Sequence, residues 1–505
     1  MDTRFKHKPN YTLRHRLHKG VLRNLAILVL LGLASVQAFA QTHYVAVNGS
    51  DSPGNGGQQN PWATISYAID HVSDGATILV GGGTYNGRVR LDQKFASGIV
   101  IRSQPLYQAK LRHNSGATVI CFSCQGVTLE GFDIAHSANN SGALVIQIQT
   151  SEAHDVVLRN NIIHDSTNND LLKINNGTRD ITVQGNLFYN QAGSDEHIDI
   201  NSVENVTVID NVFFNSSSQS STSSYVLVKD SNGNSDGVVG SKDISIRRNI
   251  FFNWQGNSAQ SFVRIGEDNT PTFEAQRVLI ENNLMLGNSS RLMRSAFTVG
   301  GSKDIRFQFN TIVGDLPSRS FNRLVLGGLP NQNIVLSNNI WSDPTGTMGT
   351  EGFNGADVFE ALSGASTSVT LDNNLYYNGG NAIPPDTTQD VNIAADSNAK
   401  IGDPKLASQA GLVLPVYNGS SFSGGFTTIR QVFLDLANRY GKPAAGSIAI
   451  NQASAGNIPA DDLLGATRTS NADIGAIEVG AQPPTEPPTP GVAKAVLSWL
   501  MLLLD

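Results

Sequence analysis

An asparagine recurs at the same place in eight related phrases between residues 155 and 378. The phrases are DVVLRNNIIHD, DITVQGNLFYN, NVTVIDNVFFN, DISIRRNIFFN, RVLIENNLMLG, DIRFQFNTIVG, NIVLSNNIWSD and SVTLDNNLYYN. Alignment places eight asparagines in one column, 25 to 38 residues apart: Asn161, Asn186, Asn211, Asn249, Asn283, Asn310, Asn339 and Asn374. Self-similarity at such a period is typical of a solenoid, in which each repeat adds one coil to a stack.

Each phrase alternates apolar and polar residues before the asparagine and continues into a short apolar run after it, as Ile181 and Val183 do before Asn186. This pattern indicates strands joined by turns rather than helices. We therefore predict an all-β fold, a right-handed parallel β-helix (solenoid). Equivalent residues of successive coils then lie about 4.8 Å apart, so buried asparagine amides can hydrogen-bond from coil to coil at a bend. The asparagine column is predicted to be structural and not catalytic.

The segments outside the repeat predict the domain organisation. Seven basic residues precede the apolar run LAILVLLGLA, and Ala38-Phe39-Ala40 fits a small-x-small cleavage site, so residues 1–40 are predicted to be a signal peptide. Asn60-Pro61 predicts the start of a short capping helix that covers the open end of the first coil. The predicted divisions are a signal peptide (1–40), an N-terminal cap (41–75), the β-helix (76–380), a C-terminal extension (381–480), and a proline-rich linker with a short apolar tail (481–505).

Charge and cysteine content exclude some classes of function. Removal of residues 1–40 leaves 28 basic and 41 acidic side chains, a net charge of about −13, which argues against a nucleic-acid partner. An acidic protein is also compatible with a calcium-rich exterior. Cys121 and Cys124 are the two cysteines of the chain, so the fold does not depend on a disulfide framework. They form either a local disulfide or a pair of packed thiols.

The asparagine column also fixes the register of a second strand in four successive coils, at residues 171–175, 197–201, 225–229 and 262–266. Alternation predicts that eight apolar residues of these strands point inward: Leu172, Ile174, Ile198, Ile200, Val226, Val228, Val263 and Ile265. The remaining positions form three outward columns: Leu171/His197/Tyr225/Phe262, Lys173/Asp199/Leu227/Arg264 and Asn175/Asn201/Lys229/Gly266. Later coils show Thr298, Val325 and Gly327 instead, so the polar patch is predicted to end at Arg264.

The residues on this face suit β-elimination on an acidic polysaccharide, which needs the uronate carboxylate neutralised and a base for the neighbouring carbon. Lys173 is a candidate base because Arg264, Lys229 or a bound cation would help its ammonium lose a proton, and His197 is the other candidate. The predicted catalytic residues are Lys173, His197, Tyr225 as proton donor, and Arg264. The predicted substrate-binding residues are Asn175, Asp199, Asn201 and Lys229. Stacked acids on adjacent turns predict a Ca²⁺ site at Asp170, Asp195 and Glu196.

Two other functions use the same residues. Asp170, Asp195 and Asp199 offer paired carboxylates for a glycoside hydrolase, in which the separation of the acids would decide between retaining and inverting chemistry. A non-catalytic surface protein that binds glycan through its exposed face is the third reading, because the fold alone does not establish an activity.

Two segments resemble known families. The coil DLLKINNGTRDITVQGNLFYN resembles the corresponding region of pectate- and alginate-lyase-like β-helix enzymes, which implies an acidic calcium ligand, Asp170, before a strand-borne lysine base, Lys173. The alginate-lyase pattern has an arginine one coil beyond the lysine, whereas this chain has Asp199 there. DLLGATRTSNADIGAIE resembles the C-terminal region of secreted choice-of-anchor proteins, at Gly465, Arg468, Asp473, Gly475 and Glu478. We expect a monomer, secreted or attached to the cell envelope through its tail, that binds an acidic polysaccharide.

Overall fold

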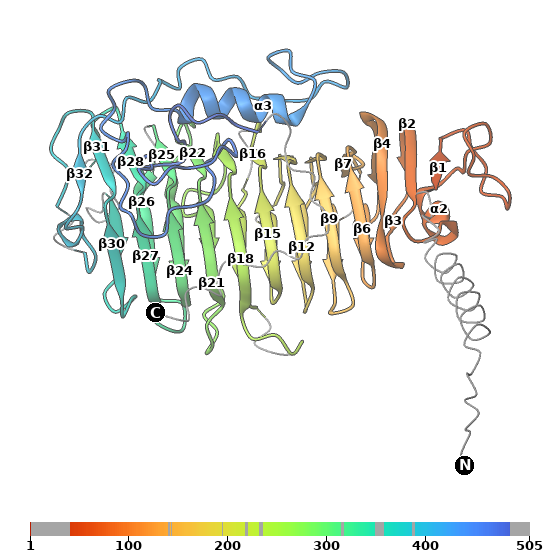
Figure 1. Cartoon of the computed structure of the whole chain (residues 1–505), viewed down its shortest axis with the longest axis horizontal. Coiled ribbons are helices and arrows are strands. Elements are labelled where there is room, and N and C mark those ends of the chain that lie inside the picture. Colours follow the sequence, from red (N-terminus) through yellow and green to blue (C-terminus); the bar gives the residue numbers. More distant parts are fainter. Residues whose placement is uncertain are drawn as a thin grey trace. The chain divides into compact units, whose positions relative to one another are not determined.

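The parallel β-helix predicted from the asparagine column is confirmed by a computed structural model, which is nearly all β, with a sheet of 22 strands and another of ten. Figure 1 shows the strands side by side in a stack of coils that begins at Thr42. The predicted signal peptide and the apolar tail lie outside the described residues, which are 1, 41–139, 142, 144–193, 195–217, 221–231, 236–314, 318–348, 358–385 and 389–484.

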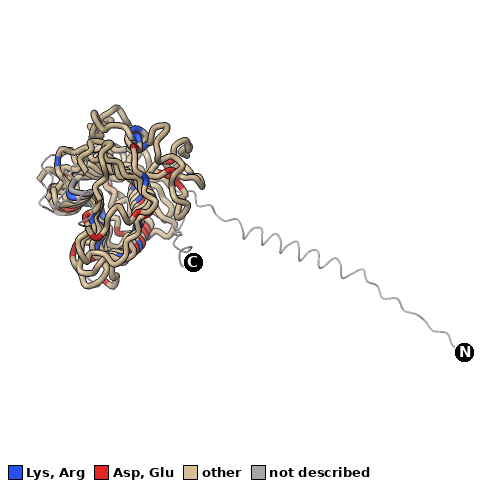
Figure 2. The backbone as a smooth tube through the Cα atoms, turned by 90° about the vertical axis from the view of Figure 1, so that its left-hand side faces the viewer, with Lys and Arg blue, Asp and Glu red and all other residues tan. Residues whose placement is uncertain are grey.

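A typical coil contains three strands, such as β12 (Arg179–Gln184), β13 (Leu187–Tyr189) and β14 (Glu196–Asn201). Each strand pairs in parallel with its counterparts in the coils before and after it. Alternate residues of β12 point inward, so Ile181 and Val183 are buried in the interior of the coil. The coils therefore overlie one another when the stack is viewed along its length (Figure 2).

The 22-stranded sheet contains two successions of strands that meet at the asparagine bend. The strands before the bend are β6 (Gln125–Glu130), β9 (His154–Arg159), β12, β15 (Glu204–Ile209), β18 (Ser241–Arg247), β21 (Ala275–Glu281), β24 (Ser302–Gln308), β27 (Gln332–Ser337) and β30 (Val369–Asp372). The strands after it are β7 (Asp133–His136), β10 (Ile162–His164), β13, β16 (Val212–Phe214), β19 (Ile250–Phe252), β22 (Leu284–Leu286), β25 (Thr311–Val313), β28 (Ile340–Asp343), β31 (Leu375–Asn378) and β32 (Lys400–Ile401).

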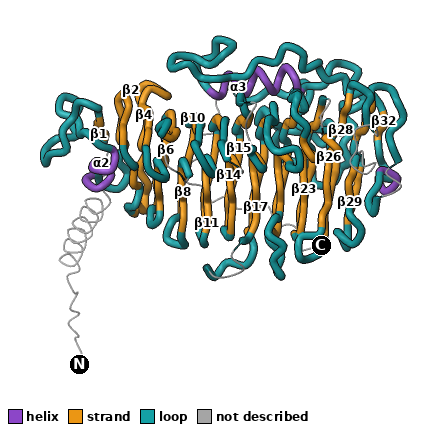
Figure 3. The backbone as a smooth tube through the Cα atoms, turned by 180° about the vertical axis from the view of Figure 1, so that it is seen from behind, coloured by secondary structure: helices purple, strands orange, loops and turns teal. Residues whose placement is uncertain are grey.

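The ten-stranded sheet forms the opposite wall of the coils, and Figure 3 shows its strands in a row. Its members are β3 (Val89–Arg90), β5 (Val119–Cys121), β8 (Ile146–Gln149), β11 (Leu172–Asn175), β14, β17 (Ser224–Lys229), β20 (Ser261–Ile265), β23 (Met293–Gly300), β26 (Ser318–Val325) and β29 (Phe359–Ala361). Lys173, Asp199 and Arg264 lie in one column of residues on the strands of this sheet.

The eight asparagines form a continuous buried ladder. In each pair the Oδ1 of one asparagine accepts from both the backbone N–H and the side-chain amide of the asparagine one coil earlier, as Asn186 does for Asn161 at 2.9 and 3.1 Å. The ladder ends at Asp396, whose Oδ2 accepts from the Asn374 amide. The residue before each asparagine has a positive φ, for example 55° at Asn160, which turns the chain sharply between the two strands. The predicted structural role of the column is confirmed.

An N-terminal segment packs at the first coil. It contains β1 (Thr42–Val45) and the helix α2 (Ile65–His71), which precede β2 (Thr77–Asn86) and β4 (Lys94–His113). Ile65 and Ile69 of α2 are buried in the main core. The predicted start at Asn60-Pro61 is wrong, because Thr64 is the N-cap and its side chain accepts from the Tyr67 N–H.

After β32 the chain turns back and packs along the outer face of β10 to β25. We call residues 404–478 the return segment. It contains α3 (Ile429–Leu436), which is followed by a π-helical turn (Ala437–Gly441). A short 3-10 helix (Ile393–Ala395) lies before the segment. Apolar residues of α3 such as Phe433 pack with Phe214, Phe252 and other outward residues of these strands. Gln108 donates to the Tyr417 hydroxyl at one end of the stack, and Asn338 donates to Ser454 near the other. Among the described residues, no helix is long and apolar enough to cross a membrane.

Charged side chains tie the return segment to the coils. Arg248 pairs with Asp210 of the coil wall and with Asp461 of the return segment. Arg468 is buried and donates to Asn282 of the wall at 2.7 Å and to the Gly475 backbone oxygen. Residues of the choice-of-anchor resemblance thus hold this segment against the β-helix.

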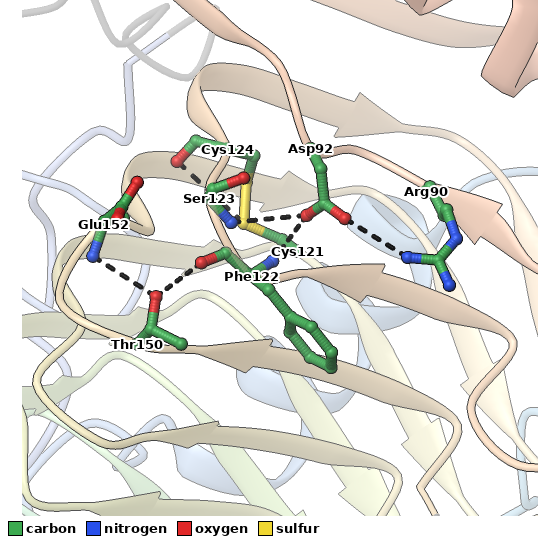
Figure 4. Close-up of a disulfide and its surroundings, with 8 residues drawn as sticks. All are labelled: Arg90, Asp92, Cys121, Phe122, Ser123, Cys124, Thr150 and Glu152. Atoms are coloured by element: carbon green, nitrogen blue, oxygen red, sulfur yellow. Dashed lines mark hydrogen bonds and ion pairs between the residues drawn. A yellow bond between two sulfur atoms is a disulfide. The ribbon is translucent and has the colours of Figure 1, made fainter.

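The two cysteines form a local disulfide. Cys121 and Cys124 are joined across the turn after β5, and both are buried. Asp92 accepts from the backbone N–H groups of Phe122 and Ser123 at 2.6 and 3.3 Å, which fixes the turn (Figure 4). The disulfide alternative is therefore the one found in the structure.

Candidate active site

The predicted outward column of the ten-stranded sheet is present. Lys173 of β11 pairs with Asp199 of β14, Asp199 with Leu227 of β17, and Leu227 with Arg264 of β20. The column continues beyond the predicted end, because Arg264 pairs with Thr298 and Thr298 with Arg323 of β26. The prediction that Val325 takes this place in the later coil is wrong. Arg323, two residues earlier, takes this place.

Three carboxyl groups meet beside Lys173. One oxygen from each of Asp170, Glu196 and Asp199 lies within 4.8 Å of the other two, and all three residues are buried. We call these three residues the acidic triad. Asp170 lies in the turn before β11, and its Oδ1 accepts from the Glu196 backbone N–H at 2.9 Å. This hydrogen bond links the turns of two adjacent coils and brings the carboxyls together.

Burial and mutual repulsion favour the protonated forms of Asp170 and Glu196. Burial, together with the charge of Asp199, raises the pKa of Asp170 to about 7. Burial and the charges of Asp170 and Asp199 likewise raise the pKa of Glu196 well above its ordinary value. Like charges held this close cannot all ionise without compensation. The triad therefore favours either protonation or a bound cation.

Lys173 contacts two carboxylates of the triad. Its Nζ forms an ion pair with Asp199 and lies 3.7 Å from Asp170 Oδ2. Burial lowers the pKa of the Lys173 ammonium, but the two carboxylates outweigh this effect and raise the pKa above its ordinary value. The expectation that Lys173 loses its proton readily beside Arg264 and Lys229 is therefore wrong for this arrangement, because Asp199 is one coil away whereas Arg264 is three.

The acidic triad fits a hard divalent cation. Three carboxylates against one ammonium leave uncompensated negative charge, and oxygen ligands are those that Ca²⁺ prefers. Among the described residues, Asp199 Oδ1 is buried without a hydrogen-bond partner, although it belongs to this cluster. The predicted ligand Asp195 is not part of the triad, and Asp199, predicted to bind substrate, takes its place. Asp195 is half-buried, and burial raises its pKa.

The predicted outward orientation of His197 and Tyr225 is wrong. Both are fully buried inside the coil, where their rings stack with centroids 4.3 Å apart next to the core residue Phe213. The strand register pairs Glu196 with Ser224 and Ile198 with Val226 but skips the two aromatic residues between them. Two consecutive residues therefore point inward, and Glu196 replaces His197 on the outer face. Leu171 and Phe262 are buried in the same core.

The interior positions leave neither ring available for catalysis. Burial lowers the pKa of His197 to about 3, so the imidazole is neutral, and its Nε2 contacts Asn215 Oδ1 at 3.0 Å. The Tyr225 hydroxyl lies 2.9 Å from the Asn253 backbone oxygen, and burial raises its pKa well above the ordinary value. Both residues therefore serve the packing of the coil.

The remaining predicted residues lie near the triad. Lys229 pairs with Glu267 at 3.0 Å and Asp268 at 3.4 Å, and Arg264 pairs with Glu267 at 2.8 Å. Burial lowers the pKa of Lys229, but the charges of Asp199 and Glu267 outweigh burial, so the pKa lies above its ordinary value. Asn201 donates to Ser231, and Asn175 Oδ1 is buried without a hydrogen-bond partner among the described residues. Sequence reasoning missed Glu267, because it follows Gly266 and lies outside the strand alternation.

Comparisons with known proteins establish the fold alone. No family model and no curated protein matches the chain. Among solved structures, a complex of XylC with xylose is 12% identical, covers 87% of this chain and 98% of that chain, and has a TM-score of 0.51. Pectate lyase Pel9A is 14% identical over 87% of this chain and 97% of that chain, with a TM-score of 0.44. A rhamnogalacturonan lyase is 13% identical over 77% and 96%, with a TM-score of 0.46.

Proposed function

We propose that the chain is a carbohydrate-active enzyme that cleaves an acidic, uronate-containing polysaccharide by β-elimination. The observation that carries the proposal is the acidic triad beside Lys173, on an outward column of the ten-stranded sheet. A cation bound by Asp170, Glu196 and Asp199 would neutralise a uronate carboxylate and so acidify the proton on the neighbouring carbon. This is the first requirement of the reaction.

Lys173 supplies the second requirement. Its Nζ is the basic nitrogen that contacts the triad, since it reaches both Asp199 and Asp170. The charges of Asp199 and Asp170 raise the pKa of Lys173, and a cation bound by these carboxylates would offset them, so that Lys173 could act as a neutral amine. That amine would accept the proton from carbon while the bond from the next carbon to the glycosidic oxygen breaks and a carbon–carbon double bond forms. The resulting ammonium can then donate that proton to the leaving oxygen. Arg264 and Lys229, on the following coils, are proposed to hold the substrate carboxylates.

Product chemistry tests the proposal. The mature chain is incubated with alginate, pectate and other uronate polymers, with calcium or with chelator, and the products are followed by ultraviolet absorbance and reducing ends. Elimination yields an unsaturated, absorbing sugar, and we expect it to require calcium. Lys173→Ala should abolish this absorbance, whereas the control Lys242→Ala, which removes a lysine paired with Glu204 on the other sheet, should leave it unchanged. Full activity of Lys173→Ala would remove Lys173 as the base.

A glycoside hydrolase is the second candidate, and one observation favours it. Asp170, with its pKa raised to about 7, holds a proton near neutral pH beside the carboxylate of Asp199. A protonated acid next to a carboxylate is the pattern of glycosidases, and carboxyls about 5 Å apart belong to the retaining class. Reducing ends without unsaturated product would support this candidate. A polymer that is bound but never cleaved would support a glycan-binding surface protein.

We also propose that the protein acts outside the cytoplasm as a monomer, either secreted or held at the cell envelope through its tail. The basic-then-apolar pattern of residues 1–40 and the proline-rich, apolar residues 481–505 support this proposal. N-terminal sequencing of the protein from culture medium and envelope fractions tests it, with cleavage after Ala40 as the expected result. Retention of the full chain in the cytoplasm would contradict it.

A further inference from the structure

An arginine cluster lies farther along the same outward column. Between Asp199 and Arg264 there are two strand pairings, and two more lead from Arg264 through Thr298 to Arg323. Since neighbouring strands are about 4.8 Å apart, Arg264 is about 10 Å and Arg323 about 19 Å from Asp199 along the stack. The face therefore runs from an acidic site to a region rich in arginine.

Arg294 completes this cluster. It lies at the start of β23 and forms an ion pair with Glu360 of β29, while Arg323 Nε lies 3.3 Å from the other oxygen of Glu360. Glu360 is buried, whereas the side chain of Arg323 is 24% exposed and so reaches solvent. We call Arg264, Arg294 and Arg323 the arginine cluster.

Among the described residues, the arginine cluster has more guanidinium groups than carboxylates that form ion pairs with it. Glu360 faces both Arg294 and Arg323, and Glu267 is shared between Arg264 and Lys229. Among the described residues, two carboxylates thus form ion pairs with the three guanidinium groups, and Asp268 is a second partner of Lys229. Burial lowers the pKa of Arg323 and Glu360 raises it, while the nearby Arg294 and Arg264 act in the same direction as burial, so that the pKa is lowered overall. An additional anion at the exposed part of Arg323 would relieve this repulsion.

We propose that the arginine cluster is a second subsite, which binds a carboxylate of the same acidic polysaccharide chain several sugars away from the acidic triad. The inference rests on the proposed function for the identity of the polymer. Guanidinium groups bind carboxylates with two parallel hydrogen bonds, which suits uronate side groups better than neutral hydroxyls. A chain lying along the column would contact the triad at one end and Arg323 at the other.

Binding of matched oligosaccharides tests the subsite. A uronate hexasaccharide and its carboxyl-reduced, neutral counterpart are titrated by calorimetry, with calcium, into the full mature chain that carries Lys173→Ala to prevent turnover. Adding Arg323→Gln should weaken binding of the uronate hexasaccharide about tenfold, the effect of one charge-assisted hydrogen-bonded pair, and should leave the neutral one unchanged. The control Arg306→Gln, an arginine of β24 on the other sheet, should change neither.

Glu360→Gln separates binding from a structural role. Removing this carboxylate raises the surplus positive charge, so the uronate hexasaccharide should bind more tightly, although the thermal midpoint falls. A merely structural pair predicts lower stability and no gain in affinity for either variant. The inference is overturned if Glu360→Gln binds the uronate hexasaccharide with unchanged or weaker affinity. It is also overturned if Arg323→Gln loses affinity equally for both hexasaccharides. Arg323-dependent binding without cleavage by the native chain would support the subsite and refute the proposed enzyme, whereas absence of any uronate binding overturns both.

Discussion

The buried carboxyl of Asp170 gives a prediction whose size follows from the structure. Its pKa is raised from 3.8 to about 7, mainly by burial and then by the charge of Asp199. An acid whose pKa is raised by folding binds its proton more tightly in the folded state than in the unfolded state. The stabilising contribution of Asp170 is therefore present below pH 4 and is lost as the pH rises through about 7. A shift of about three units corresponds to about 4 kcal/mol, which is large against the total stability of a domain.

Asp170→Asn removes this penalty, because an amide does not ionise. The Asn oxygen can still accept from the Glu196 N–H, which Asp170 does at 2.9 Å. In chelator near pH 8, the variant should therefore have a free energy of unfolding higher than the native chain by up to about 4 kcal/mol, less the contribution of the Lys173 contact. Near pH 4 the two should be equal within error. The advantage should grow between these limits.

Calcium should reduce the advantage of the variant. Stabilisation by a ligand is about 2.7 kcal/mol at one hundred times its dissociation constant, and the variant lacks one of the three carboxylates that would hold the ion. Urea unfolding at several pH values, with chelator and with calcium, measures both effects. Asp180→Asn, the same change at a partly exposed residue of β12, serves as control. A difference between variant and native chain that is constant with pH, or equal stabilisation of both by calcium, would refute the reasoning.

Three further changes test the fold and the corrected site. Asn249→Ala leaves the buried Asn211 N–H without its acceptor and removes the amide that donates to Asn283. The free energy of unfolding should therefore fall by about 3 kcal/mol. An unchanged urea midpoint would contradict a structural role for the ladder. Burial lowers the pKa of His164, but its hydrogen bonds to Asp133 and Asp165 outweigh burial and raise the pKa overall. The stability that these contacts provide is complete below pH 6.5 and is lost as the pH rises through the pKa of the folded state. His164→Asn should therefore lower the thermal midpoint most in acid and least in alkali. Tyr225→Phe should cost about 1 kcal/mol and leave substrate affinity and turnover unchanged, and a selective loss of turnover would return Tyr225 to the site.

The coil architecture could be predicted because the asparagine amide has one stable environment in such a stack. A buried amide must satisfy its donors and its acceptor, and a copy of itself one coil away does both, so the residue recurs at a fixed place. The same register correctly placed Lys173, Asp199 and Arg264 in one outward column. Along these strands, alternation and pairing agree with the sequence.

The errors have local causes. At His197 and Tyr225 the strands depart from alternation, and large aromatic rings stack inside the coil where a regular strand would place them outside. Their neighbour Glu196, which alternation would have buried in the core, instead joins Asp170. The direction of the Lys173 pKa depends on contacts of a few ångströms that residue spacing does not determine. Arg323 was missed because the register of this strand was assigned two residues late, at Val325.

The return segment alters how the β-helix loses its structure. In a simple solenoid each coil contacts only its two neighbours, so coils can open one at a time from an end. Here residues 404–478 contact strands from β4 to β28, through Gln108, Arg247, Gln308 and Asn338 among others. Opening of a terminal coil must therefore also detach the part of the return segment that contacts it. We expect the described coils to unfold together with this segment, as one cooperative unit rather than as a series.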